Sequence, residues 1–169
     1  MTIGVLAVGN RFAGDDAIGP LVLDGVRDEL PAGVVTRELD GEPTRLLDAW
    51  EGLAAVVLVD AASSGSPPGT VHRVVAVEAS DPRAPRASDG TVVGITLPRA
   101  SRSTHGAGVA EALGLGGRLG RLPAEVVVLG IEGRRFSPGT GLSHEVAHVL
   151  PAAVRAVRDE VDRLVARHI

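Results

Sequence analysis

The sequence contains no cysteine, no lysine and no tyrosine, and all 17 of its basic residues are arginine. Without cysteine, thiolate nucleophiles, thiolate metal ligands and disulfides are excluded. Without lysine, neither a Schiff base nor the lysine of a phosphate-binding P-loop is available. Without tyrosine, no phenol can act as an acid. Catalysis would therefore depend on Asp, Glu, His, Ser or Thr.

Aromatic residues are also scarce, at 2% of the chain: Phe12, Trp50 and Phe136. The core must be built from Val, Leu, Ile and Ala, and continuous runs of these residues are typical of strands buried on both faces. We expect one domain over residues 1–169, long enough to bury an ordinary core. The net charge of −4 does not favour a nucleic-acid or membrane partner.

The N-terminal residues MTIGVLAVGN lack a basic segment and lead straight into a strand, so we expect no signal peptide. No apolar run approaches the length of a membrane span. These features predict a cytoplasmic protein, and we expect it to be a monomer.

Strand and helix patterns alternate along the chain. We expect strands over residues 3–8, 34–39, 55–61, 70–79 and 125–131. We expect helices over residues 16–30 and 43–50, from 103 or 104 to about 113, and from about 143 onward. This order predicts an α/β fold, a three-layer α/β/α sandwich with a twisted, mostly parallel sheet of about five strands. Residues 80–103 are predicted to be irregular, and long loops of this kind are often functional.

The segment GNRFAGDD (Gly9–Asp16) joins the first strand to the first helix. Its two glycines have the spacing of a P-loop, but Asp15 and Asp16 replace the lysine and the Ser or Thr of that motif. A phosphate would meet two negative charges here, whereas a cation would be attracted. The alternative is that the pair caps the helix and interacts favourably with its dipole.

Asp60 closes the apolar run VVLVDA. A carboxylate in so apolar a strand would cost several kcal/mol if it were buried without a partner. It therefore either lies at the open end of the strand, as a turn former, or holds a positive group. Ligands of such sheets collect at the carboxyl ends of the strands, so we expect Asp16, Asp40 and Asp60 at one edge.

His105, in RSTHGAG, begins the helix after the long loop. Alone it would be an exposed histidine of a first turn. With Asp16 and Asp60 it would complete a ligand set of two carboxylates and an imidazole, which suits nickel, zinc or manganese. The spacing in the sequence does not establish that the three meet.

A rival motif, His144-Glu145-Val146-Ala147-His148, matches the H-E-x-x-H pattern of zinc peptidases. At about 100° per residue, the apolar positions of this helix cluster on one face and the two histidines lie on nearly the opposite face. We therefore expect this pair to face solvent and not to form a zinc site.

Four segments together resemble the hydrogenase maturation endopeptidases, over nearly the whole chain. They are AVGNRFAGDDAIGP at the start, LVDA around Asp60, STHGAG at Ser103–Gly108, and GIEGRRFSPGTGLS before the last helix. The first is the most specific. One departure is Asp40-Gly41-Glu42, where many members have a second glycine, which leaves the shape of this loop open.

The resemblance implies a twisted sheet flanked by helices and an endopeptidase that removes the C-terminal extension of a nickel–iron hydrogenase large-subunit precursor. It implies that Asp16, Asp60 and His105 are both the metal-binding and the catalytic residues. The metal would be nickel already held by the substrate, or another divalent metal in its place. The precursor would be the partner. The protease would recognise the bound nickel as a sign that metal insertion into the precursor is complete.

The residues leave several points open. The metal could polarise the scissile carbonyl, or Asp16 or Asp60 could activate water as a base. A non-proteolytic metal-binding or nickel-delivery protein would use the same three ligands. A nucleotide-binding protein is disfavoured by the missing lysine and the acidic pair. In the loop 80–103, Arg99 and Arg102 are candidates for gripping the C-terminal segment of the precursor.

Overall fold

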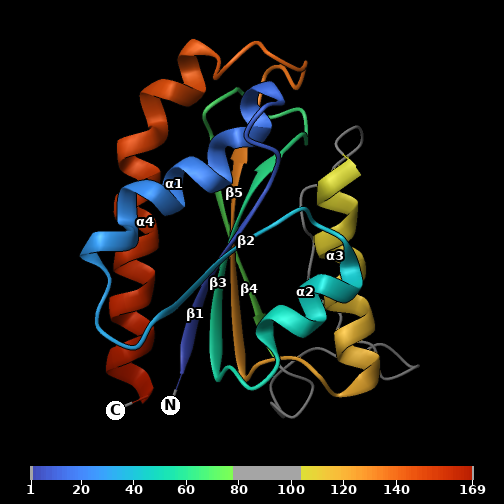
Figure 1. The fold of residues 1–169 in the computed structure, drawn as a ribbon, viewed down its shortest axis with the longest axis vertical. Coiled ribbons are helices and arrows are strands. Elements are labelled where there is room, and N and C mark those ends of the chain that lie inside the picture. The colour runs from blue at the N-terminus through green and yellow to red at the C-terminus, as the bar shows by residue number, and fades with distance from the viewer. Residues whose placement is uncertain (1, 78–103, 169) are drawn as a thin grey trace.

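The computed structural model describes residues 2–77 and 104–168, without the side chains of residues 76–77, 104–107 and 168. A five-stranded sheet lies between two layers of helices (Figure 1). The strands are β1 (Ile3–Val8), β2 (Val35–Leu39), β3 (Ala55–Ala62), β4 (Val71–Val77) and β5 (Glu125–Glu132). Their order is β2-β1-β3-β5-β4, and every neighbouring pair is parallel except β4 and β5. The predicted three-layer, mostly parallel sandwich is confirmed.

The helices are α1 (Ile18–Val26), α2 (Pro43–Trp50), α3 (Thr104–Leu119) and α4 (His144–His168). Short 3-10 turns at Gly14–Ala17 and Arg27–Glu29 flank α1, so the single helix predicted over residues 16–30 is divided into three pieces. None of the helices in the described part of the chain is long and apolar enough to cross a bilayer.

Helix α3 is longer than predicted, because the glycines beyond Leu113 do not break it. A Cβ at Gly116 would lie 2.8 Å from Leu122 Cδ2 and 3.2 Å from Leu47 Cδ2. The missing side chain thus lets α3 pack closely on the leucines of its neighbours. Tertiary packing outweighs the low helix propensity of glycine here.

The two faces of the sheet have separate apolar clusters. In β3, Val57 and Val59 pack with α1 and α4, whereas Val56 and Leu58 pack with α2 and α3. This alternation follows from the two-residue repeat of a strand. By the same repeat, Asp60 belongs to the face of α2 and α3.

The connections reverse direction at β1. From β1 the chain passes through α1 on one face to β2, and from β2 it returns through α2 on the other face to β3. Strands β1 and β3 are therefore hydrogen-bonded neighbours whose following connections diverge. Open α/β sheets bind their ligands in the crevice at such a switch point, beyond the carboxyl ends of the strands.

Candidate active site

The turn after β1 folds back over the ends of the strands. Gly9 has φ +148°, and a Cβ there would lie 2.0 Å from the carbonyl oxygen of Asp16. Gly19, in the first turn of α1, would bring a Cβ within 2.4 Å of Val8 O and 2.8 Å of Val59 O. Glycine at these two positions allows α1 to begin directly above β1 and β3. The turn thereby carries Asp15 and Asp16 to the switch point.

Asp15 is a structural residue. Its fully buried carboxylate accepts hydrogen bonds from the backbone N–H groups of Arg134 (2.7 Å), Arg135 (3.0 Å) and Ser143 (2.6 Å), and from Ser143 Oγ (2.8 Å). Burial alone would raise the pKa of Asp15, but these hydrogen bonds outweigh it and lower the pKa below its ordinary value. Asp15 thus fastens the first loop to the loop between β5 and α4. It caps no helix, and its oxygens are committed to these donors.

Asp16 and Asp60 form the carboxylate pair at the switch point. Asp16 is 2% exposed and Asp60 is 4% exposed. The backbone N–H of Asn10 donates to Asp16 Oδ2 at 2.8 Å. Burial raises the pKa of Asp60 well above its usual range, and the negative charge of Asp16 raises it further. The structure thus places the two carboxylates close enough for their charges to interact.

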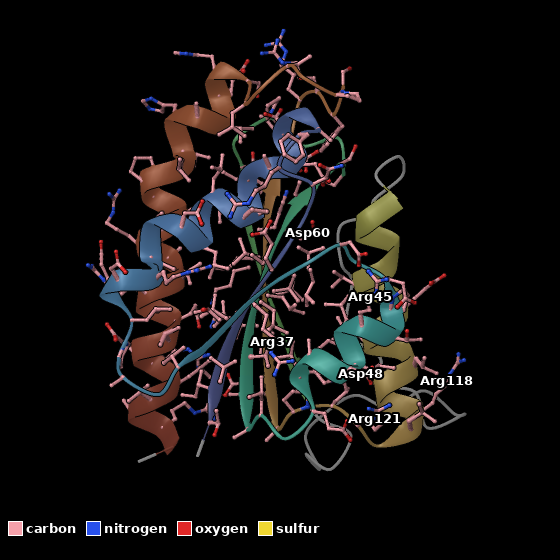
Figure 2. The ribbon with its side chains drawn as sticks, in the orientation of Figure 1. Arg37, Arg45, Asp48, Asp60, Arg118 and Arg121 are labelled. Atoms are coloured by element: carbon pink, nitrogen blue, oxygen red, sulfur yellow. The ribbon has the colours of Figure 1, made fainter. Side chains whose placement is uncertain are left out.

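Asp60 lies inside its strand, which corrects the expectation that the strand ends at residue 61 and that Asp60 could be a turn former. Strand β3 continues to Ala62, and Asp60 stands opposite Gly130 of β5. Figure 2 shows Asp60 near the end of the sheet, toward the side of α3. Among the described groups, no hydrogen-bond partner is present for Asp60 Oδ1. A buried carboxylate oxygen in this state can receive a cation or a proton donor.

His105 is the second residue of α3, and its side chain lies outside the described residues. The backbone places the start of α3 at the carboxyl edge of the sheet (Figure 1). A Cβ at Gly108 would lie 1.9 Å from Gly41 O, so α3 approaches the loop after β2 as closely as backbones allow. Among the described side chains, no three of His, Asp or Glu form a metal-binding group. The structure therefore brings two of the three predicted ligands together and does not test the third.

A cleft of about 480 Å³ opens at the ends of β1 and β2, and its lining includes Gly9, Glu38, Leu39, Asp40 and Arg45. The carboxylate of Asp40 is hydrogen-bonded to Arg45. Arg45 lies at the start of α2 (Figure 2). The sequence pattern predicts Asp40 at this edge but does not indicate Glu38 or Arg45. Both are ordinary charged residues of amphipathic elements, so no motif signals them.

Glu42 stands after Asp40-Gly41, at the position where many hydrogenase maturation endopeptidases have a second glycine. Its structural role accounts for this difference. Its side chain accepts hydrogen bonds from the backbone N–H groups of Thr44 (3.2 Å) and Arg45 (3.0 Å) and so caps α2. The capping side chain stabilises the first turn of this short helix. The loop after β2 therefore ends at the capped first turn of α2.

Comparison with known proteins finds similar solved structures. No protein-family model matches the chain, and no curated protein sequence matches it. Among solved structures, the [NiFe] hydrogenase maturation protease HybD from Thermococcus kodakarensis is 25% identical, with a TM-score of 0.70, over 95% of this chain and 99% of that one. The hydrogenase 2 maturation peptidase from Thaumarchaeota archaeon SCGC_AB-539-E09 is 28% identical, with a TM-score of 0.64, over 95% and 98%. The chain is thus similar to the hydrogenase maturation proteases in fold and in sequence, over nearly its whole length.

The hydrogenase maturating endopeptidase HybD from E. coli has the same fold, with 24% identity and a TM-score of 0.70 over 96% of this chain and 93% of that one. These proteins are named as proteases, peptidases or endopeptidases, and the similarity supports a peptidase.

Two further predictions concern residues away from the carboxylate pair. His144 and His148 are exposed on α4, with ring centroids 6.4 Å apart, while Val146 between them is fully buried. The prediction that they face solvent is confirmed. Arg99 and Arg102 lie outside the described residues, so their predicted grip on the substrate stays a prediction.

Proposed function

We propose that this protein is an endopeptidase that removes the C-terminal extension of a nickel–iron hydrogenase large-subunit precursor after nickel insertion. In this proposal Asp16, Asp60 and His105 receive the nickel that the substrate carries. The large-subunit precursor is the partner, and processing takes place in the cytoplasm.

The observation that supports this proposal best is the buried carboxylate pair of Asp16 and Asp60. Two desolvated carboxylates repel each other, and the repulsion falls when a cation lies between them. Carboxylate oxygens together with an imidazole suit a divalent transition metal. A substrate that brings such an ion to the crevice gains affinity that the same substrate without the ion lacks.

The location of the pair supports recognition of a metal that is already bound elsewhere. Asp16 comes from the turn after β1, Asp60 from β3, and His105 is at the start of α3. Three ligands from one protein leave coordination positions free for other ligands, as in metal sites that bind substrates. The side chains that hold nickel in the precursor would occupy those positions.

Two routes for hydrolysis fit the same residues. In one, the nickel of the substrate polarises the scissile carbonyl, and water attacks its carbon. In the other, Asp16 or Asp60 takes a proton from the attacking water as a general base. In both, water adds to the carbonyl carbon, the C–N bond breaks, and the departing amine takes up a proton.

Variants of the three residues test the proposal. Asp16→Asn, Asp60→Asn and His105→Ala should each abolish processing of a nickel-loaded precursor, as measured by intact mass. Thermal melts of the same preparations should show folded proteins. Full processing by any one variant would remove that residue from the site. Asp162→Asn, on the exposed side of α4, is a matched control that should process normally.

A further inference from the structure

The side chain of Phe12 is exposed to solvent. Its exposed fraction is 78%, the largest among the large hydrophobic residues of the described chain. The other two aromatic residues belong to the interior, because Trp50 is 1% exposed and Phe136 packs against the core. One of the three aromatic residues of this chain is therefore exposed at the surface.

Hydrogen bonds hold the backbone at Phe12 from both sides. Its N–H donates to Asn10 Oδ1 at 2.9 Å, and its carbonyl accepts from the N–H of Gly139 at 2.8 Å. A further bond from Ala13 N–H to Asn10 O, at 3.2 Å, closes the turn. The turn is thus fixed both internally and to the loop before α4.

Arg11, the preceding residue, is fixed by two carboxylates. Its guanidinium donates to Asp24 of α1 at 2.7 and 2.9 Å and to Glu38 of β2 at 2.8 to 3.1 Å. Paired hydrogen bonds of this kind are geometrically specific. Phe12 therefore projects from a turn whose position is set before any partner arrives, and little backbone entropy remains to be lost on binding.

We propose that Phe12 is the aromatic anchor through which this protease docks on its precursor, inserting into an apolar pocket on the folded large subunit beside its nickel site. The inference rests on the proposed function. A substrate that brings its nickel to Asp16 must cover the turn that carries Asp16. Phe12 is four residues away, at most about 14 Å along the chain.

The size of ordinary interfaces places Phe12 inside the contact area. A specific protein complex buries about 800 Å² on each partner, which is a patch wide enough to include both Asp16 and Phe12. Aromatic residues are enriched in such patches, and a few well-packed anchors carry most of the binding energy. An aromatic ring that is 78% exposed buries most of its surface when it enters a pocket, and a folded surface offers such pockets.

The test is steady-state processing of nickel-loaded precursor by the wild type, Phe12→Ala, Phe12→Leu and Leu119→Ala. Leu119 is an exposed control on α3, with 54% of its surface accessible. We expect Phe12→Ala to raise KM about ten-fold or more while kcat and the melting temperature stay unchanged. Phe12→Leu should recover most of the loss, and Leu119→Ala should match the wild type.

Three results would overturn the inference. The first is a KM for Phe12→Ala within about two-fold of the wild type, and the second is a loss confined to kcat. The third is a wild-type dimer that Phe12→Ala converts to a monomer in size-exclusion chromatography, since the anchor would then join two copies of this chain. If the wild type does not cleave the precursor at all, the proposed function fails. In that case, direct binding of the precursor to the wild type and to Phe12→Ala still tests the anchor.

Discussion

Asp15→Asn should destabilise the protein strongly, although it changes only one atom of the side chain. Oδ1 of Asp15 accepts from Ser143 N–H, and Oδ2 accepts from Arg134 N–H, Arg135 N–H and Ser143 Oγ. An asparagine has one acceptor oxygen and an NH₂ group that only donates. In either orientation, its NH₂ group faces at least one buried backbone N–H. That N–H loses its acceptor, and the remaining bonds lose the charge that strengthens them.

The expected cost follows from these bonds. A buried donor left without an acceptor costs about 1–3 kcal/mol, and bonds to a neutral acceptor are weaker than bonds to a charged one by about 1 kcal/mol each. Relief from burying a charge offsets part of this, so we expect a loss of about 2–4 kcal/mol in the free energy of unfolding. For a chain of this size, that corresponds to a fall of roughly 5–12 °C in melting temperature.

Thermal unfolding monitored by circular dichroism measures this effect. Asp162→Asn makes the same chemical change at an exposed site of α4 and should shift the melting temperature by no more than about 2 °C. If Asp15→Asn melts within the same margin of the wild type, the hydrogen bonds to Asp15 do not stabilise the fold. The assignment of Asp15 as the residue that joins the two loops would then be wrong.

Three further predictions follow from the same contacts. Asp60→Asn should keep or raise the melting temperature, because it removes a buried charge that repels Asp16, while processing is lost; a fall of several degrees would contradict this. The double variant His144→Ala/His148→Ala should process near the wild-type rate, and a loss of activity together with a loss of bound zinc would show that the solvent-facing pair is functional. Gly108→Ala should unfold at least about 5 °C lower, because the new Cβ would meet Gly41 O at 1.9 Å. A Cβ at Gly114 would have nothing within 4 Å, so Gly114→Ala should be neutral or stabilise the protein by up to about 1 kcal/mol. Equal melting temperatures for the two alanine variants would refute the close approach of α3.

The sequence was sufficient to predict the architecture and to place two of the candidate site residues at one edge of the sheet. The bounds of β1 (Ile3–Val8) and α2 (Pro43–Trp50) agree with the predicted ranges, because apolar periodicity and helix-start signals are local. Asp16 follows β1 and Asp60 lies near the end of β3, so the rule that ligands collect at the carboxyl ends of parallel strands predicts both residues at one edge.

The different roles of Asp15 and Asp16 could not be predicted, because the two are chemically identical neighbours. Their roles depend on the loop before α4, where Ser143 is 128 residues from Asp15 in sequence. The length of α3 was underestimated for a similar reason. Glycine disfavours a helix locally, but Gly116 is required by close packing against Leu47 and Leu122.

The most direct test of the central claim compares one precursor in two states. A hydrogenase large-subunit precursor is prepared with and without nickel, incubated with chelator-treated enzyme, and followed by intact mass spectrometry. Our account predicts loss of the C-terminal extension from the nickel-loaded precursor and no cleavage of the nickel-free one. Cleavage of the nickel-free precursor at the full rate would contradict recognition of the metal and favour a direct acid–base peptidase. Nickel transfer between the proteins without any loss of mass would instead indicate a nickel-delivery protein of the same fold.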